Sequence, residues 1–296
     1  MGSTLKWSLT EHLLSNYQGE FQTATQHPFL LAAAEGRLPK DVLGKWLAND
    51  RLYIHSYIRA AGKLLSSIDL PPTAPKTPGA EAFETQLVDW LIEALTAVRR
   101  EERLFIDVAD RYGLDVNLGT IQTSTTSDTT AGAVIDETAK LPGLVMIEDI
   151  FSSVAQSSSA SEQIALGTAS FSDRPPRSTL IPWLEGAVTF WGTERCYLEA
   201  WSWAKARQST SGAPGDVRED ADGGALRKEF IPNWSSPDFA RFVQKLGSLI
   251  DFAIDEVLQK VGEDEVERVK TEILGRVESR WKSLLAAEAS FWPQVD

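Results

Sequence analysis

Apolar residues recur every three or four positions in nearly every segment of this chain that is not rich in serine, threonine, glycine or proline. This spacing places them on one face of an α-helix. The alternation of apolar and polar residues that marks strands is missing, and so are Asn-Gly hairpin turns. The sequence therefore predicts an all-α protein.

The same spacing, with proline and glycine as boundary signals, delimits the expected helices. Ser/Thr-rich segments at 119–139 and 156–179 and a polar segment at 208–224 are predicted as loops inserted in one domain, residues 1–296. No fixed-period repeat is present. The predicted helices span residues 10–24, a short stretch that ends at Gly36, a long stretch from residue 40, 81–113, 144–155, 181–207, 237–261 and 265–291.

The composition excludes some classes of protein and disfavours some binding partners. The 296 residues include 12 Phe and 10 Trp, enough for a large core, and a single cysteine excludes an intramolecular disulfide framework. The net charge of −13 disfavours nucleic acid and anionic membranes as partners, and no segment has the roughly 20 apolar residues that cross a bilayer. We expect a soluble, cytoplasmic protein.

Three acidic residues lie within apolar stripes. Asp50, Glu194 and Glu288 each occupy a helical position that should face the core. A buried carboxylate without a partner costs several kcal/mol, so such groups are normally paired, hydrogen-bonded or shifted in pKa. Each is a candidate site residue; the alternative is an acid at a stripe edge bonded to a nearby Arg or backbone amide.

Aromatic residues accompany these acids. Tyr53 lies one turn from Asp50 and is placed to donate to it or to a ligand. Tyr57, Trp191 and Trp234 are either walls of a pocket for a flat ligand or bulky core packing, and spacing does not separate the two.

Other polar groups suggest no further chemistry. The three histidines lack metal-ligand spacing, and no glycine-rich phosphate motif is present, so neither a metal nor any other cofactor is expected. Glu101 and Glu102 lie among Arg99, Arg100 and Arg103, which indicates a solvated helix face with local ion pairs.

Three segments resemble the TenA/thiaminase II family. HPFLLAAAEGRLPKDVLGKWLANDRLYIHSY is similar to its N-terminal signature, a His-Pro-Phe, a Gly-x-Leu-Pro turn and a helix with Asp-x-x-Tyr. FIPNWSSPDFARFV and LLAAEASFWPQV resemble its Ser-Ser-x-x-Phe segment and its closing Glu-x-x-Phe-Trp helix. The resemblance covers about two-thirds of the chain and is loose over 114–179.

The resemblance implies a haem-oxygenase-like helical bundle with a central pocket and no haem. It implies hydrolysis of aminopyrimidines, with Asp50 holding the amidine edge of the ring, Tyr53 orienting it and Glu288 moving protons. Members often form dimers or tetramers, so a homo-oligomer is expected.

One departure from the family concerns its nucleophilic cysteine. Alignment puts Trp191 at that position, and Cys196, five residues later, points about 140° away on a helix. Glu194 is the candidate to occupy the vacated space. Trp234 stands where many members have a pocket tyrosine.

The sequence thus predicts a TenA-like hydrolase of a small aminopyrimidine that uses acid/base chemistry without the cysteine. The predicted catalytic residues are Glu288 and Glu194, and the predicted substrate-binding residues are Asp50, Tyr53, Tyr57, Trp191 and Trp234. The alternatives are a binding or regulatory protein that kept the pocket, and a purely structural role.

Overall fold

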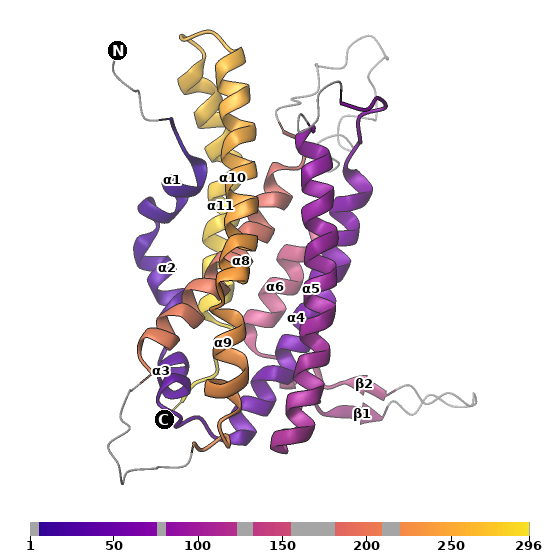
Figure 1. The fold of residues 1–296 in the computed structure, drawn as a ribbon, viewed down its shortest axis with the longest axis vertical. Coiled ribbons are helices and arrows are strands. Elements are labelled where there is room, and N and C mark those ends of the chain that lie inside the picture. Colours follow the sequence, from indigo (N-terminus) through magenta and orange to yellow (C-terminus); the bar gives the residue numbers. More distant parts are fainter. Residues whose placement is uncertain (1–5, 76–80, 123–132, 155–180, 209–219, 296) are drawn as a thin grey trace, which may run out of the picture.

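The computed structural model describes residues 6–75, 81–122, 133–154, 181–208 and 220–295. Within them the protein is a bundle of helices whose longest members, α4, α5, α10 and α11, run along the long axis of the molecule (Figure 1). The all-α prediction is confirmed. The helices are α1 (Leu9–Asn16), α2 (Gln18–Thr25), α3 (Pro28–Ala34), α4 (Lys40–Ser67), α5 (Phe83–Tyr112), α6 (Pro142–Ser152), α8 (Leu184–Ala206), α9 (Ile231–Trp234), α10 (Pro237–Lys260) and α11 (Val266–Ala289).

Local sequence sets several helix ends. The His27 ring accepts the backbone N–H of Phe29 at the start of α3, and Ser236 does the same for Phe239 at the start of α10. α5 ends at Gly113, whose φ of 66° is the left-handed conformation that glycine adopts without strain. These helices therefore begin and end close to where the boundary signals place them.

Two local predictions are corrected. The helix expected over 10–24 is broken at Tyr17, which has a non-helical backbone, so that α1 packs on α10 while α2 packs on α11 and α8. The loop expected at 119–139 contains two short antiparallel strands, β1 (Thr120–Gln122) and β2 (Ala133–Ile135), followed by a 3-10 turn at Glu137–Ala139. Residues 156–179 and most of 208–224 lie outside the described residues, and the single-domain prediction stays a prediction.

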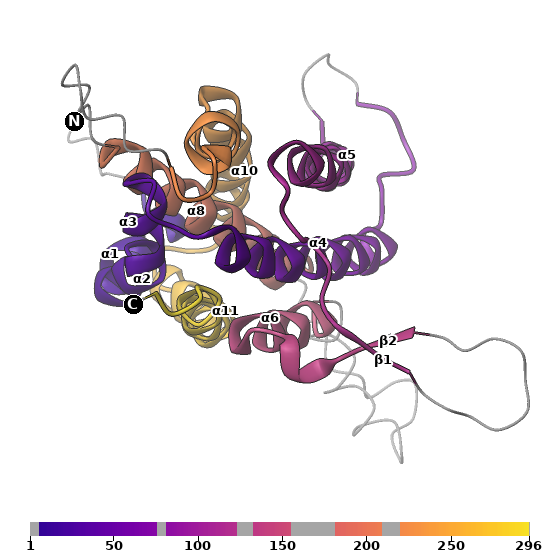
Figure 2. The same cartoon turned by 90° about the horizontal axis from the view of Figure 1, so that it is seen from below.

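α4 is the central element of the bundle. Figure 2 shows it with α5 on one side and α6 and α11 on the other, and it packs against both α5 and α6. α8 lies against α10 and α11 and is buried over most of its surface. The polar residues of α4 that point inward therefore meet side chains from α5, α8 and α11.

Tryptophan-rich packing fills one end of this core. Trp46 of α4 and Trp201 of α8 are fully buried, with ring centroids 5.5 Å apart. Trp234 of α9 and Trp292, just after α11, pack around them. This cluster fixes the relative positions of α4, α8, α9 and the end of α11.

Candidate functional site

A small cavity of about 30 Å³ lies between α4, α5 and α8. α4 contributes Asp50, Tyr53 and Tyr57, at a spacing of three and four residues that puts all three on one face. The remaining lining residues are Ile54 of α4, Val98 and Glu101 of α5, and Thr193, Glu194 and Tyr197 of α8. Three carboxyl groups from three different helices therefore converge on one space.

Each acid in and beside the cavity accepts a hydrogen bond from an uncharged aromatic donor. Asp50, 3% exposed, accepts from the Tyr197 hydroxyl at 2.8 Å. Glu194 accepts from Tyr57 at 2.7 Å. Glu288 of α11 is 1% exposed and accepts from Tyr53 at 3.0 Å, so it reaches the cavity through that hydroxyl. The fourth acid, Glu101, accepts from the Trp234 indole N–H.

Burial raises the pKa of every one of these acids. It raises the pKa of Glu288 and of Glu194 to about 8, and the hydrogen bonds from Tyr53 and Tyr57 offset only part of that rise. Burial also raises the pKa of Glu101 to about 7 and holds the pKa of Asp50 well above its usual range, where nearby Glu101 adds to the effect. Near neutral pH the site is rich in protonated carboxyl groups that can donate a proton.

The structure brings some of the predicted site residues together at the cavity and places others elsewhere. Asp50, Tyr53, Tyr57 and Glu194 line the cavity together. The predicted Trp191 and Trp234 are not among the residues that line it. The Trp191 ring stacks on Trp281 with centroids 5.4 Å apart, which is the packing alternative, and Trp234 lies behind Glu101, to which its indole N–H donates.

A glycine on α10 makes room for the Trp191 indole. A Cβ at Gly247 would lie 2.8 Å from the Trp191 indole nitrogen, so the indole fits only because that position is glycine. Trp191 is therefore part of the core between α8, α10 and α11.

Three functional candidates were missed by sequence reasoning: Glu101, Thr193 and Tyr197. Glu101 was interpreted as part of a solvated face, but its side chain turns into the cavity. Glu102, which is 5% exposed, does form the local ion pairs that the sequence predicts. Its carboxylate lies 2.7 Å from His55, and Arg51 and Arg99 also pair with it. Glu101 continues the three- and four-residue spacing from Ala94 and Val98 to Phe105, but Glu102 continues it equally well, so the sequence does not distinguish them.

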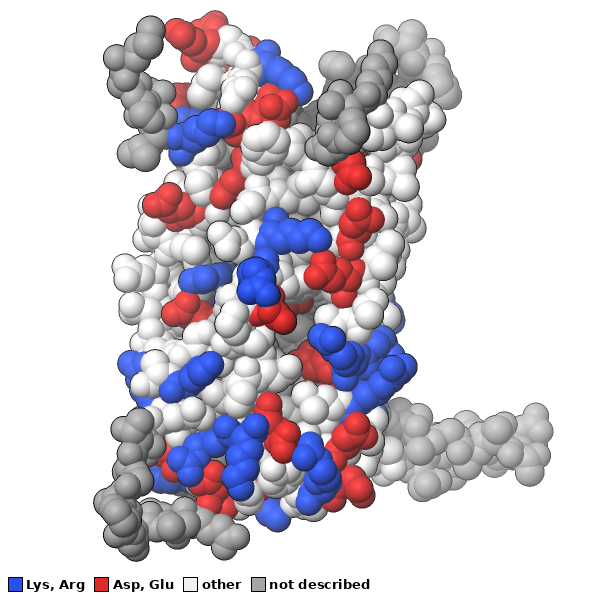
Figure 3. All heavy atoms as spheres, viewed as in Figure 1, with Lys and Arg blue, Asp and Glu red and all other residues white. Residues whose placement is uncertain are grey.

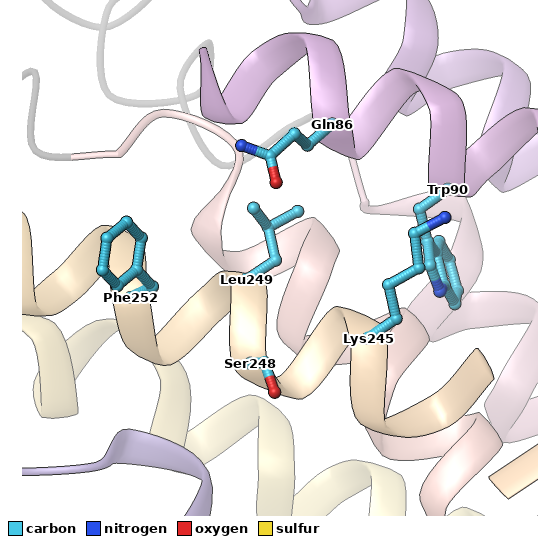
Figure 4. A pocket seen from close by; sticks show the side chains of 6 residues that line it. All are labelled: Gln86, Trp90, Lys245, Ser248, Leu249 and Phe252. Atoms are coloured by element: carbon cyan, nitrogen blue, oxygen red, sulfur yellow. The ribbon is translucent and has the colours of Figure 1, made fainter. Parts of the chain in front are cut away.

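A second, larger hollow lies on the surface between α5 and α10 (Figure 4). It measures about 400 Å³ and is lined by Gln86, Trp90, Lys245, Ser248, Leu249 and Phe252. Its one charged lining residue, Lys245, pairs with Glu93 at 2.9 Å. It lacks converging acids or bases, so the small polar cavity is the candidate site.

The described residues give no sign of a metal site or of a membrane span. They contain no group of three or more His, Cys, Asp or Glu side chains arranged to hold a metal ion. No helix among them is long and apolar enough to cross a bilayer. On the face drawn in Figure 3, acidic side chains lie among the basic ones, so no continuous basic surface is visible there.

Comparison with known proteins gives this geometry a family context. Residues 15–98 match the model of the TENA/THI-4/PQQC family, and the structure superimposes on a TenA homologue from Pyrococcus furiosus with a TM-score of 0.56, 20% identity and coverage of 96% of this chain and 97% of that one. The chain has a TenA-like fold. A TenA family transcription regulator from Silicibacter sp. TM1040 gives a TM-score of 0.57 at 14% identity over 98% and 97% of the two chains.

The structural matches show that the TenA-like chain has the haem-oxygenase-like fold, as predicted. A curated relative from Fusarium pseudograminearum (strain CS3096), described as a probable transcription factor, is 26% identical over 276 residues. That alignment covers 84% of this chain, but the chain spans only 46% of the relative's length.

The alignment with the TenA family places Trp191 of α8 at the position of the family's cysteine. The α8 residues that line the cavity are instead Thr193, Glu194 and Tyr197. Cys196 is 2% exposed and is not among them, in line with the rotation expected from its position. The Thr193 hydroxyl donates to the Phe190 carbonyl at 2.8 Å. None of the described residues that line the cavity carries a thiol.

Proposed function

We propose that this TenA-like protein binds a small aminopyrimidine in the α4–α5–α8 cavity and hydrolyses its exocyclic C–N bond. The observation that supports this best is the convergence of Asp50, Tyr53 and Glu194 on one cavity, with Glu288 bonded behind Tyr53. A carboxyl group beside hydroxyl donors suits the donor and acceptor edge of an aminopyrimidine ring.

The proposed reaction needs one base and one acid. Water attacks the carbon of the C–N bond and the C–N bond breaks, while Glu194 takes the proton of the water in the fraction of molecules in which Glu194 is ionised. Because its pKa is about 8, that fraction grows as the pH rises above neutrality. Tyr53 gives its proton to the departing nitrogen and is reprotonated by Glu288, whose pKa of about 8 keeps it protonated near neutrality. Asp50 holds the ring. The products are the pyrimidine alcohol and ammonia.

The size of the cavity sets a requirement on binding. Its 30 Å³ is about the share of one liquid water molecule, so a ring enters only if wall side chains move. The wall formed by α5 packs chiefly against α4 and α10. We infer that ligand entry displaces side chains on the α5 side, where Glu101 and Glu194 are partly exposed.

The test is product formation from 4-amino-5-aminomethyl-2-methylpyrimidine, its N-formyl derivative and thiamine. We expect Glu288→Gln and Asp50→Asn to lower kcat/KM by about 100-fold or more, because the first removes the acid that reprotonates Tyr53 and the second removes the carboxyl group that holds the ring. Glu267→Gln, an exposed acid on the same helix as Glu288, should leave it unchanged. Full activity in both site variants would contradict the proposal.

A binding or regulatory role is the second candidate. It is favoured by the absence of a thiol among the described residues that line the cavity, and by two relatives whose names describe transcription factors or regulators. In that case a pyrimidine raises the melting temperature and no product forms. A homo-oligomer, dimer or tetramer, and a cytoplasmic location remain predictions under either function.

A further inference from the structure

Glu101 is the cavity acid for which neither the sequence nor the family resemblance provides a role. It projects from α5 one turn after Val98, and both residues face α4 and α8 across the cavity. Among the described residues its one hydrogen-bond donor is the Trp234 indole N–H. The indole therefore fixes the direction of a carboxyl group that is open toward the cavity.

The adjacent residue shows what a purely structural acid looks like on this helix. Glu102 is surrounded by His55, Arg51 and Arg99, which neutralise its charge. Glu101 has no such partner: none of the described residues that line the cavity is Lys, Arg or His. A structural acid would be expected to have a cation nearby, as Glu102 has.

The charges around Glu101 add to this imbalance. Glu101 raises the pKa of Asp50 and of Glu194 by repulsion, so it lies close enough to both to act on the same ligand. Among the described basic groups, Arg100, next to it in the sequence, is the one that favours its ionised form. The titratable side chains that face this space are Asp50, Tyr53 and Tyr57 of α4, Glu194 and Tyr197 of α8, and Glu288 of α11.

We propose that Glu101 is a specificity-determining residue of this site, which binds the positively charged or N–H-rich end of a cationic nitrogen heterocycle while Asp50 binds the other edge of its ring. The proposal rests on the proposed ligand site, not on hydrolysis. A cation in this position would supply the counter-charge that the cavity lacks and would favour ionised Glu101 over its protonated form.

The test compares a cationic probe with a neutral one of the same shape, the benzamidinium ion and benzamide, by isothermal titration calorimetry at pH 7.5. For the wild type we expect the benzamidinium ion to bind at least about tenfold more tightly, and Glu101→Gln to reduce that preference by about tenfold, the size of one hydrogen bond to a charged group. Glutamine keeps an acceptor for Trp234. Glu93→Gln, an exposed acid two turns earlier on α5, should keep the wild-type preference.

A second readout separates charge recognition from a structural effect. Binding of the benzamidinium ion should release protons, measured from the dependence of the binding heat on the buffer, and Glu101→Gln should reduce that release. A folded Glu101→Gln protein with unchanged preference and unchanged proton release would overturn the proposal, and so would a wild type that binds the two probes equally.

The outcomes also separate the two proposals. Benzamidinium preference that depends on Glu101, without hydrolysis of any pyrimidine, would support the role of Glu101 and reject the hydrolase. Hydrolysis by a Glu101→Gln variant whose preference between the probes is unaltered would support the hydrolase and reject the role of Glu101.

Discussion

Burial raises the pKa values of the acids of this site, and hydrogen bonds from neutral donors offset only part of that rise. A phenol or indole stabilises a carboxylate less than an arginine does, so the cost of burial dominates. The contrast is visible on one helix, where Glu102 has basic partners and Glu101 has an indole. Because donors of this kind leave the acids protonated near neutrality, the same residues that bind a ligand can also deliver protons.

The single thiol gives a test at the residue scale. Cys196 is 2% exposed, and burial raises its pKa well above the ordinary value, with Glu288 adding repulsion. We expect no reaction of the native protein with Ellman's reagent over minutes, and one thiol per chain in denaturant. Rapid titration of one thiol in the native protein would show that Cys196 faces an accessible site.

At the scale of elements, the bundle depends on close approaches that glycine permits. Gly143 of α6 lies against the backbone of Ala287, Ser290 and Phe291 at the end of α11, and its N–H donates to the Ser290 carbonyl at 3.1 Å. This contact is next to Glu288. The position of the α6–α11 contact therefore also sets the position of a site acid.

A matched pair of substitutions tests this contact. Gly143→Ala adds a methyl group that meets backbone atoms of α11, and we expect it to reduce the free energy of unfolding by about 2 kcal/mol or more. Gly275→Ala, in the middle of α11 with open space around it, should raise stability by about 0.5–1 kcal/mol through helix propensity. Urea unfolding measures both, and equal effects would contradict the packing described here.

The elements also show what the sequence could and could not reveal. The stripe of α4 and the end of α5 at Gly113 follow from local signals, and so does the alignment of Asp50 with Tyr53. The break at Tyr17 does not, because it arises from packing α1 and α2 on different helices.

α8 limited the prediction of the site more than any other helix. It is buried over most of its surface, so its spacing does not reveal which face meets the cavity. The sequence predicts Trp191 there, but Thr193 and Tyr197 line the cavity. Glu101 and Glu102 both fit the stripe of α5, and only the neighbouring helices distinguish them.

At the scale of the whole molecule, the raised pKa values link stability to pH. An acid whose pKa is about 8 when folded and 4.5 when unfolded binds more protons in the folded state between those values. Its contribution to stability is therefore complete below about pH 4.5 and is lost as the pH rises through 8. Glu288 and Glu194 both act in this direction.

Glu288→Gln tests this linkage, since glutamine stays neutral at every pH and is close in shape. We expect the variant and the wild type to have similar melting temperatures near pH 5, and the variant to become the more stable protein by roughly 4 kcal/mol near pH 8.5. Burial lowers the pKa of His27 in both proteins, so the effect of His27 on stability is the same in both and cancels in the comparison. Glu267→Gln, exposed on the same helix, should follow the wild type at each pH. Differential scanning calorimetry from pH 5 to 8.5 measures the three curves. Parallel curves for Glu288→Gln and wild type would mean that Glu288 ionises without cost in the folded protein, and the proton-donating role proposed for it would then lose its physical basis.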